Sequence, residues 1–298
     1  MKMWNHYHNP SSIDEATALL KRYAGEARII AGGTDLLVDM RAEKREPYEA
    51  LVDVTSISEL DHIQLDNSWV SIGAGVTHTQ ITKSQSLIDS ATCLVESCGL
   101  IGGPQVRNVG TLGGNVAHAL PAGDGTVSLV ALDAEAEIIH LGGLRRVPIM
   151  DMYRGAGQSL LTSGRDLLLR LHVKVSGQRE GSAFQRIMRP QGVALPILGC
   201  AVWLRLDETL ENFEDVRVCI APTNPTPHRI TAVEDVLAGQ PVGETTIERA
   251  ISIAQQTLTL RTSKYRATAE YRREMVAVLL RRVIPVAVER ARSGNAGI

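Results

Sequence analysis

The sequence predicts an α+β fold made of three successive units, residues 1–57, 58–175 and 176–298. Near the N-terminus, a short apolar strand leads through a glycine turn into a helix. Farther along, strands with a period of two include a hairpin, and the last unit begins with strands and ends with helices. Because strands and helices are segregated in the last two units, small antiparallel sheets with helices are expected there.

The first unit is predicted to be a β-turn-α-β unit. Ser12 and Glu15 have the spacing of a capping box, and apolar residues then recur at helical intervals. A helix is therefore expected over 13–24, ending at Gly25. The remaining expected elements are a strand over 28–31, a helix over 36–44 and a strand over 51–54.

The turn of this unit, Gly32-Gly33-Thr34-Asp35, is a candidate anion site. Two glycines allow a ligand to approach the backbone closely, and the N–H groups at a helix start favour negative charge. The alternative is a plain tight turn in which Thr34 or Asp35 caps the helix. The turn is not the GxGxxG dinucleotide fingerprint; the nearest match, residues 73–78, lacks the third glycine.

The second unit is predicted to hold an antiparallel sheet. Its strands are expected over 69–74, 136–140, 145–149 and 167–173, with the second and third forming a hairpin. One or two helices are expected within 81–98, and the apolar segment 128–132 is expected to be buried.

A second glycine-rich stretch, 102–125, contains seven glycines and two prolines. Such a stretch lets the backbone come close to a bulky ligand and lets N–H groups converge on an anion. His118 lies inside it and either touches a ligand or caps the loop by hydrogen bonding. Together the two glycine loops could grip a large dinucleotide, and a cofactor would then carry the chemistry.

The last unit is expected to contain strands over 201–206 and 216–220 and helices over 230–237, 245–260 and 267–292. A second capping box, Thr245 with Glu248, is expected to begin the middle helix. Pro285 is expected to kink the last helix. The face of that helix is rich in arginine, and we expect Arg272, Arg273, Arg281 and Arg282 to be solvated.

Composition excludes several classes of function. A formal net charge of −2 and an aromatic content of 4% argue against nucleic acid as a partner. No apolar run reaches the roughly 20 residues that span a bilayer, and the N-terminus lacks the apolar core of a signal peptide. The four cysteines form no CxxC pair, which predicts free thiols in the cytoplasm and no metal on this chain.

At the two glycine loops the sequence resembles a known family. The matching segments are Ile30-Ala31-Gly32-Gly33-Thr34-Asp35-Leu36, Ile101-Gly102-Gly103-Pro104-Gln105-Val106-Arg107-Asn108, Thr111-Leu112-Gly113-Gly114-Asn115 and Pro121-Ala122-Gly123-Asp124. In order and spacing they are similar to the FAD-binding (medium) subunit of the molybdenum hydroxylases, the xanthine dehydrogenase and carbon monoxide dehydrogenase flavoprotein family. The resemblance implies a two-part FAD-binding domain of the PCMH type followed by a C-terminal α+β domain.

The resemblance also implies FAD contacts. Residues of the first loop would wrap the FAD diphosphate through backbone N–H groups; these are Ile29, Ile30, Ala31, Gly32, Gly33, Thr34 and Asp35. The second loop would be lined by Ile101, Thr111, Gly113, Gly114 and Asn115. Asp124 would hold polar atoms of the flavin, and Leu168 would give a backbone contact. Ile101 and Leu168 could instead belong only to the core, and Asp124 could only form a turn.

One segment departs from the family pattern. Where the family often has a lysine near the flavin ring, this chain has Gln185, and Val193 replaces an aspartate, whereas Arg189 is kept. An amide at Gln185 can hydrogen-bond the flavin but cannot stabilise a reduced flavin by charge.

As a function, the resemblance implies an oxidoreductase subunit that transfers electrons and needs no catalytic side chain of its own. It would take electrons from the [2Fe–2S] clusters of a small iron–sulfur subunit, whose own donor is a large molybdenum subunit. It would pass them to NAD or another acceptor. The alternatives are a stand-alone FAD oxidoreductase of the same fold and a nucleotide-binding module without a redox role.

Overall fold

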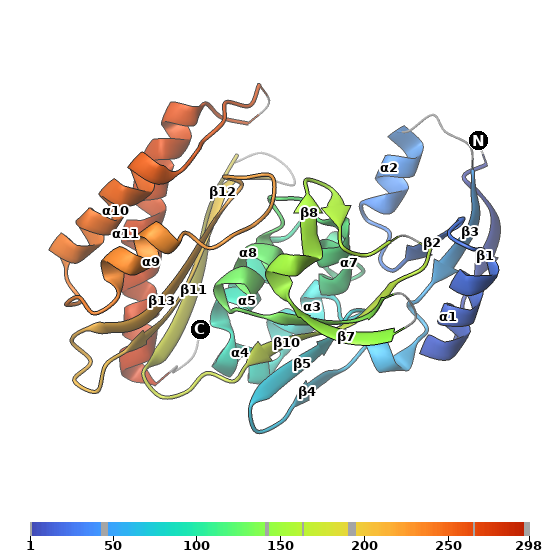
Figure 1. Cartoon of the computed structure of the whole chain (residues 1–298), viewed down its shortest axis with the longest axis horizontal. Helices are drawn as coiled ribbons and strands as arrows, with labels where there is room; N and C mark the ends of the chain where they lie inside the picture. The colour runs from blue at the N-terminus through green and yellow to red at the C-terminus, as the bar shows by residue number, and fades with distance from the viewer. Residues whose placement is uncertain are drawn as a thin grey trace.

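The computed structural model in Figure 1 describes residues 2–42, 47–140, 143–162, 164–189, 195–264 and 266–294. Val193 and residues 141–142, which lie between the two strands of the predicted hairpin, are outside these residues. The chain forms a row of three sheet-containing parts, from β1–β3 at one end to β11–β13 with α9–α11 at the other (Figure 1). None of the described helices is long and apolar enough to cross a membrane.

The first part is a three-stranded parallel sheet. Its strands β1 (Trp4–His8), β2 (Ala27–Ile30) and β3 (Tyr48–Asp53) lie in the order β1-β3-β2. The expected β-turn-α-β unit is confirmed by β2, α2 (Leu36–Ala42) and β3, whereas β1 was not expected. Its short polar sequence has no apolar alternation, and pairing with β3 fixes it as a strand.

Helix α1 (Ile13–Arg22) begins where the capping box predicts. The Ser12 hydroxyl accepts a hydrogen bond from the Glu15 amide at 3.2 Å, but the Glu15 carboxylate accepts from the amide of Ser11 rather than that of Ser12. The helix ends before the expected residue 24, because Ala24 and Gly25 both adopt positive φ values.

The second part is a five-stranded sheet in the order β4-β5-β10-β6-β7 in which every pairing is antiparallel, as predicted. Its strands are β4 (Ile63–Leu65), β5 (Trp69–Gly73), β10 (Leu167–Lys174), β6 (Glu135–His140) and β7 (Gly143–Pro148), and the last two form the predicted hairpin. Short 3₁₀ turns lie at Ser58–Leu60 and Ile149–Met152, and β8 (Tyr153–Gly155) pairs with β9 (Gln158–Ser159).

Between β5 and β6 the described chain forms six short helices, and the last three carry the second glycine-rich stretch. They are α3 (His78–Lys83), α4 (Gln85–Ser90), α5 (Thr92–Leu100), α6 (Pro104–Arg107), α7 (Leu112–His118) and α8 (Asp124–Ala131). Three helices therefore occupy the region where one or two were expected. The predicted burial of 128–132 is confirmed, since every residue of α8 is buried.

The third part is an antiparallel sheet with helices on one face (Figure 1). Its elements are β11 (Glu180–Met188), β12 (Pro196–Leu206), β13 (Phe213–Ala221), α9 (Thr231–Leu237), α10 (Glu244–Thr257) and α11 (Ala269–Ser293). The capping box at Thr245 was wrong, because the N-cap of α10 is Gly243, two residues earlier, and it has no side-chain cap. Arg272 is also not solvated: it is buried and donates to the carbonyl of Ile197 at 2.8 Å.

The two faces of the third sheet belong to different cores. Phe184 and Trp203 pack into the core of the five-stranded sheet and its helices, whereas Ala183 and Val202 pack against α9–α11. A Cβ on Gly181 would overlap the carbonyl oxygen of Ala287, so a glycine here lets α11 lie directly on β11. The boundaries of the three units at 57/58 and 175/176 stay predictions.

A partly buried ionic contact joins three distant segments at this junction. Arg290 of α11 donates to Glu96 of α5 at 2.6 Å and to the carbonyl of Ser182 at 2.7 Å. Glu96 also accepts from the backbone amide of Phe184 at 2.7 Å. Strand β11 is thus held between a helix of the second part and the last helix of the chain.

Candidate functional site

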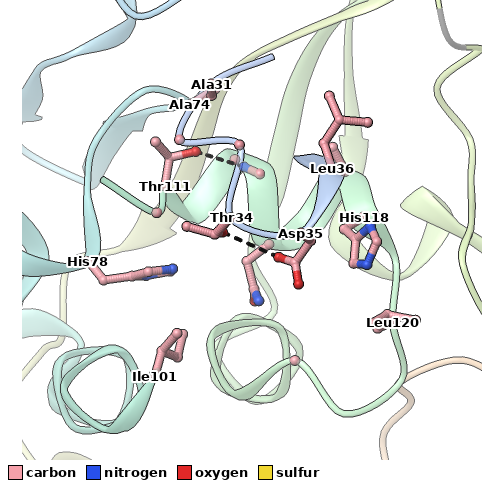
Figure 2. A pocket seen from close by; sticks show the side chains of 18 of the residues that line it. Ala31, Thr34, Asp35, Leu36, Ala74, His78, Ile101, Thr111, His118 and Leu120 are labelled. Atoms are coloured by element: carbon pink, nitrogen blue, oxygen red, sulfur yellow. Dashed lines mark hydrogen bonds between the residues drawn. The ribbon is translucent and has the colours of Figure 1, made fainter. Parts of the chain in front are cut away.

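A cleft of about 460 Å³ lies where the three parts meet, and both glycine-rich stretches line it (Figure 2). Fourteen of the fifteen predicted site residues line this cleft: Ile29, Ile30, Ala31, Gly32, Gly33, Thr34, Asp35, Ile101, Thr111, Gly113, Gly114, Asn115, Asp124 and Leu168. Gln185 is the exception. Segments separated by more than a hundred residues of sequence therefore converge on one site.

The first glycine loop offers unused backbone donors. Within the described residues, no amide from Gly32 to Leu36 donates a hydrogen bond to the chain, and α2 begins only with the bond from Leu37 N to Gly33 O at 3.0 Å. The side chains of Thr34 and Asp35 cap no amide of α2. The alternative of a plain capped turn is therefore not what the structure contains, and these donors remain for a ligand in the cleft.

Glycines bring the two loops into contact. A Cβ on Gly32 would overlap the carbonyl oxygen of Val109 and lie 2.9 Å from the Cα of Gly110. A Cβ on Gly113 would overlap the carbonyl oxygen of Ala74. Only glycine permits these backbone approaches, so the first loop, the second loop and the end of β5 close the same wall of the cleft.

The second loop is fixed by its own hydrogen bonds. The Thr111 hydroxyl accepts from the Gly114 amide at 2.9 Å and caps α7. The Asn115 side-chain oxygen accepts from Thr126 at 3.3 Å, which in turn accepts from the buried Tyr153 hydroxyl at 3.2 Å. Asn115 is therefore held at the cleft in one orientation.

A buried ion pair closes one end of the cleft. Asp124, at the start of α8, pairs with Arg186 of β11, and their side chains are only 4% and 6% exposed. Burial raises the pKa of Asp124 from its ordinary 3.8 to about 6, although the Arg186 charge pulls that pKa down. Asp124 Oδ1 and Arg186 Nε have no hydrogen-bond partner in the described chain. The end of the cleft thus keeps an unused acceptor and an unused donor.

The structure does not bring Gln185 to the cleft, which corrects that expectation. Gln185 lies on β11 between Ala183 and Ile187, both of which pack toward the helices of the third part. Strand alternation places its neighbour Arg186 on the cleft side instead. The period of two in this segment could have revealed the difference from sequence.

Sequence reasoning also missed His78. It begins α3 in the segment dismissed as a failed GxGxxG match, where Thr77 and Gln80 form a complete capping box. His78 is 3% exposed and lines the cleft. Burial, with the nearby Arg107 charge as a second cause, lowers the pKa of His78 to about 4. His118 also lines the cleft, with its Nε2 4.0 Å from a carboxylate oxygen of Asp39.

The cleft suits an elongated ligand with an anionic part. The first loop offers amides without a partner in the described chain, and the lining also contains apolar side chains such as Ile101 and Leu168. Among the described residues, no group of three or more histidines, cysteines or acids could hold a metal ion. A dinucleotide cofactor fits this set of donors and walls.

Comparison with known proteins identifies the family. The profile described as "FAD binding domain in molybdopterin dehydrogenase" matches residues 2–173, and "CO dehydrogenase flavoprotein C-terminal domain" matches residues 182–286. The chain belongs to the FAD-binding subunits of the molybdenum hydroxylases. Members of this family are oxidoreductase subunits with an FAD-binding domain and a C-terminal α+β domain, as the resemblance implied.

Relatives cover nearly the whole chain. The carbon monoxide dehydrogenase medium chain of Afipia carboxidovorans is 32% identical over 96% of this chain and 98% of that protein. The xanthine dehydrogenase FAD-binding subunit of Escherichia coli O157:H7 is 29% identical over 96% of both chains. The carbon monoxide dehydrogenase structure from Hydrogenophaga pseudoflava, at 28% identity, superposes with a TM-score of 0.89 over 97% of this chain and 99% of that one.

Proposed function

We propose that this chain binds FAD in the cleft and passes electrons through it within a molybdenum hydroxylase complex. The observation that carries the proposal is the convergence of fourteen predicted residues on one cleft whose first loop has unbonded amides. The converging residues come from segments that are far apart in the sequence. The family supports FAD as the group that belongs there.

Different residues of the cleft would bind different parts of FAD. The amides of Gly32 to Asp35 would bind the diphosphate, since they donate no hydrogen bond within the described chain. The second loop, with Thr111 and Gly113 to Asn115, would line the part of FAD that lies beyond the diphosphate. Asp124 would hold polar atoms of the flavin through its unpartnered Oδ1 side. When bound, FAD supplies the electron transfer.

Arg186 takes the place in the cleft that was expected for Gln185. Its guanidinium is fixed by Asp124, and this cation is one residue farther along β11 than the family's lysine would be. A permanent positive charge at this end of the cleft would favour a flavin that gains negative charge on reduction.

The partners are part of the proposal. Two relatives are named as a medium chain and as a subunit, and one superposed structure is titled as a Cu,Mo-CO dehydrogenase. We place molybdenum on a large subunit and [2Fe–2S] clusters on a small subunit, from which this chain takes electrons for NAD or another acceptor. We keep the cytoplasm as its location, supported by four free cysteines.

A reconstitution experiment tests the function. The purified chain is incubated with FAD, desalted and examined by visible absorbance, and its affinities for FAD, ADP and NAD are measured by calorimetry. We expect a yellow protein that binds FAD more tightly than ADP or NAD. A colourless protein, or equal affinity for all three, would favour a nucleotide-binding module without a redox role.

A second measurement distinguishes a subunit of a complex from a stand-alone FAD oxidoreductase. Co-purification of the native complex with metal analysis is expected to recover molybdenum and iron with this chain. Turnover of a reducing substrate by the isolated yellow protein, without metals or partners, would favour a stand-alone FAD oxidoreductase.

A further inference from the structure

An unpartnered histidine enters the cleft beside the first glycine loop. Figure 2 shows the His78 ring reaching into the cleft between Thr34 and Ile101. The backbone of His78 is fixed, since its amide donates to the carbonyl of Gly110 at 3.0 Å. The ring is therefore presented to the cleft by the start of α3 rather than by a free loop.

Within the described residues, the His78 ring has no hydrogen bond to the rest of the chain. Its Nδ1 is buried without a partner. A buried polar ring without partners is unfavourable by itself. Because Nδ1 is enclosed by the protein, Nε2 is the nitrogen that a ligand in the cleft can reach.

The positive charge of Arg107 favours an anion at this position. Arg107 acts electrostatically on His78, and its guanidinium donates to the carbonyls of Ile101 at 3.1 Å and Gly102 at 2.9 Å. Arg107 thereby holds the second loop against the cleft while its positive charge faces the His78 region. An anion bound between them would meet a cation, an N–H donor and the amides of the Thr34 loop.

We propose that His78 donates a hydrogen bond from Nε2 to the diphosphate of the bound cofactor. The assignment rests on the proposed function, because it needs FAD in the cleft, and it adds a binding residue to the two glycine loops. His78 is the side-chain donor that complements the backbone donors of Gly32 to Asp35.

Ligand truncation combined with mutation tests the assignment. Dissociation constants for FAD, ADP and adenosine are measured by calorimetry with the wild-type chain, His78→Leu and His78→Gln. Leucine removes the donor, whereas glutamine keeps an N–H donor at similar reach. His6→Leu is the matched control, since His6 is exposed on β1 and does not line the cleft.

His78→Leu is expected to weaken FAD and ADP by about 10- to 100-fold, the range for a hydrogen bond to a charged group, and to leave adenosine unchanged. His78→Gln is expected to recover most of the loss, and His6→Leu to bind as the wild type does. Unchanged FAD affinity in His78→Leu overturns the proposal. Equal losses for ADP and adenosine overturn it too, because the contact would then be with the nucleoside. Failure of the wild-type chain to bind FAD counts against the proposed function instead.

Discussion

The buried His78 should make the stability of the protein without cofactor depend on pH. Its folded pKa of about 4 lies below the ordinary 6.5, so the folded chain binds fewer protons than the unfolded chain between these values. The stability it contributes is therefore complete above pH 6.5 and is lost as the pH falls toward 4. Between pH 7.5 and pH 5 the free energy of unfolding falls by about 2 kcal/mol. This value follows from proton binding to His78 in the folded and unfolded chains.

Urea unfolding of the wild-type chain and His78→Leu at pH 7.5 and pH 5 measures this effect. Between pH 7.5 and pH 5, the free energy of unfolding of the wild type is expected to fall by about 2 kcal/mol more than that of the variant. Asp124 acts in the opposite direction, because its raised pKa gives stability below pH 3.8 that is lost as the pH rises through about 6. Both chains keep Asp124, so its contribution cancels in the difference. An equal change in the free energy of unfolding of the two chains between pH 7.5 and pH 5 would refute the reasoning.

Three further outcomes are expected. Gly32→Ala should force the two loops apart and weaken FAD binding by at least about 100-fold, whereas Gly243→Ala, where a Cβ meets no atom within 4 Å, should bind normally in the same titration. Arg186→Gln should lower the flavin reduction potential measured by dye equilibration, and an equal shift in Gln185→Leu, on the opposite face of β11, would contradict the assignment of the cleft cation. Arg290→Met should destabilise the chain by about 2 kcal/mol in urea unfolding; a loss below 0.5 kcal/mol (roughly the effect of an ordinary surface substitution) would contradict the role of its contact with Glu96.

Local patterns predicted much of the fold and most of the cleft. The β2-turn-α2-β3 unit and the β6–β7 hairpin follow from periodicity and turn chemistry, which are properties of neighbouring residues. The glycine loops were predicted because glycine marks positions where a side chain would collide, and Gly32 and Gly113 are such positions. The family resemblance supplied Ile101 and Leu168, which no local pattern distinguishes from core residues.

The features that the sequence did not predict depend on contacts between distant segments. Strand β1 exists because β3 offers it a parallel partner, and Arg272 is buried because the carbonyl of Ile197 accepts its hydrogen bond. Gln185 was chosen by its place in a motif, although the side of the strand decides which residue meets the cleft. His78 was missed because its burial and lack of partners are visible only once α3 packs beside the loops.

The contact of Arg290 with Glu96 has a consequence for how the protein tolerates change. No described residue of α11 lines the cleft, yet this helix contacts the strand that carries Arg186. Shortening the chain from its C-terminal end should therefore damage a binding site about a hundred positions upstream in the sequence. Loss of flavin when α11 is cleaved by a protease would indicate that the contact between Arg290 and Glu96 has been broken.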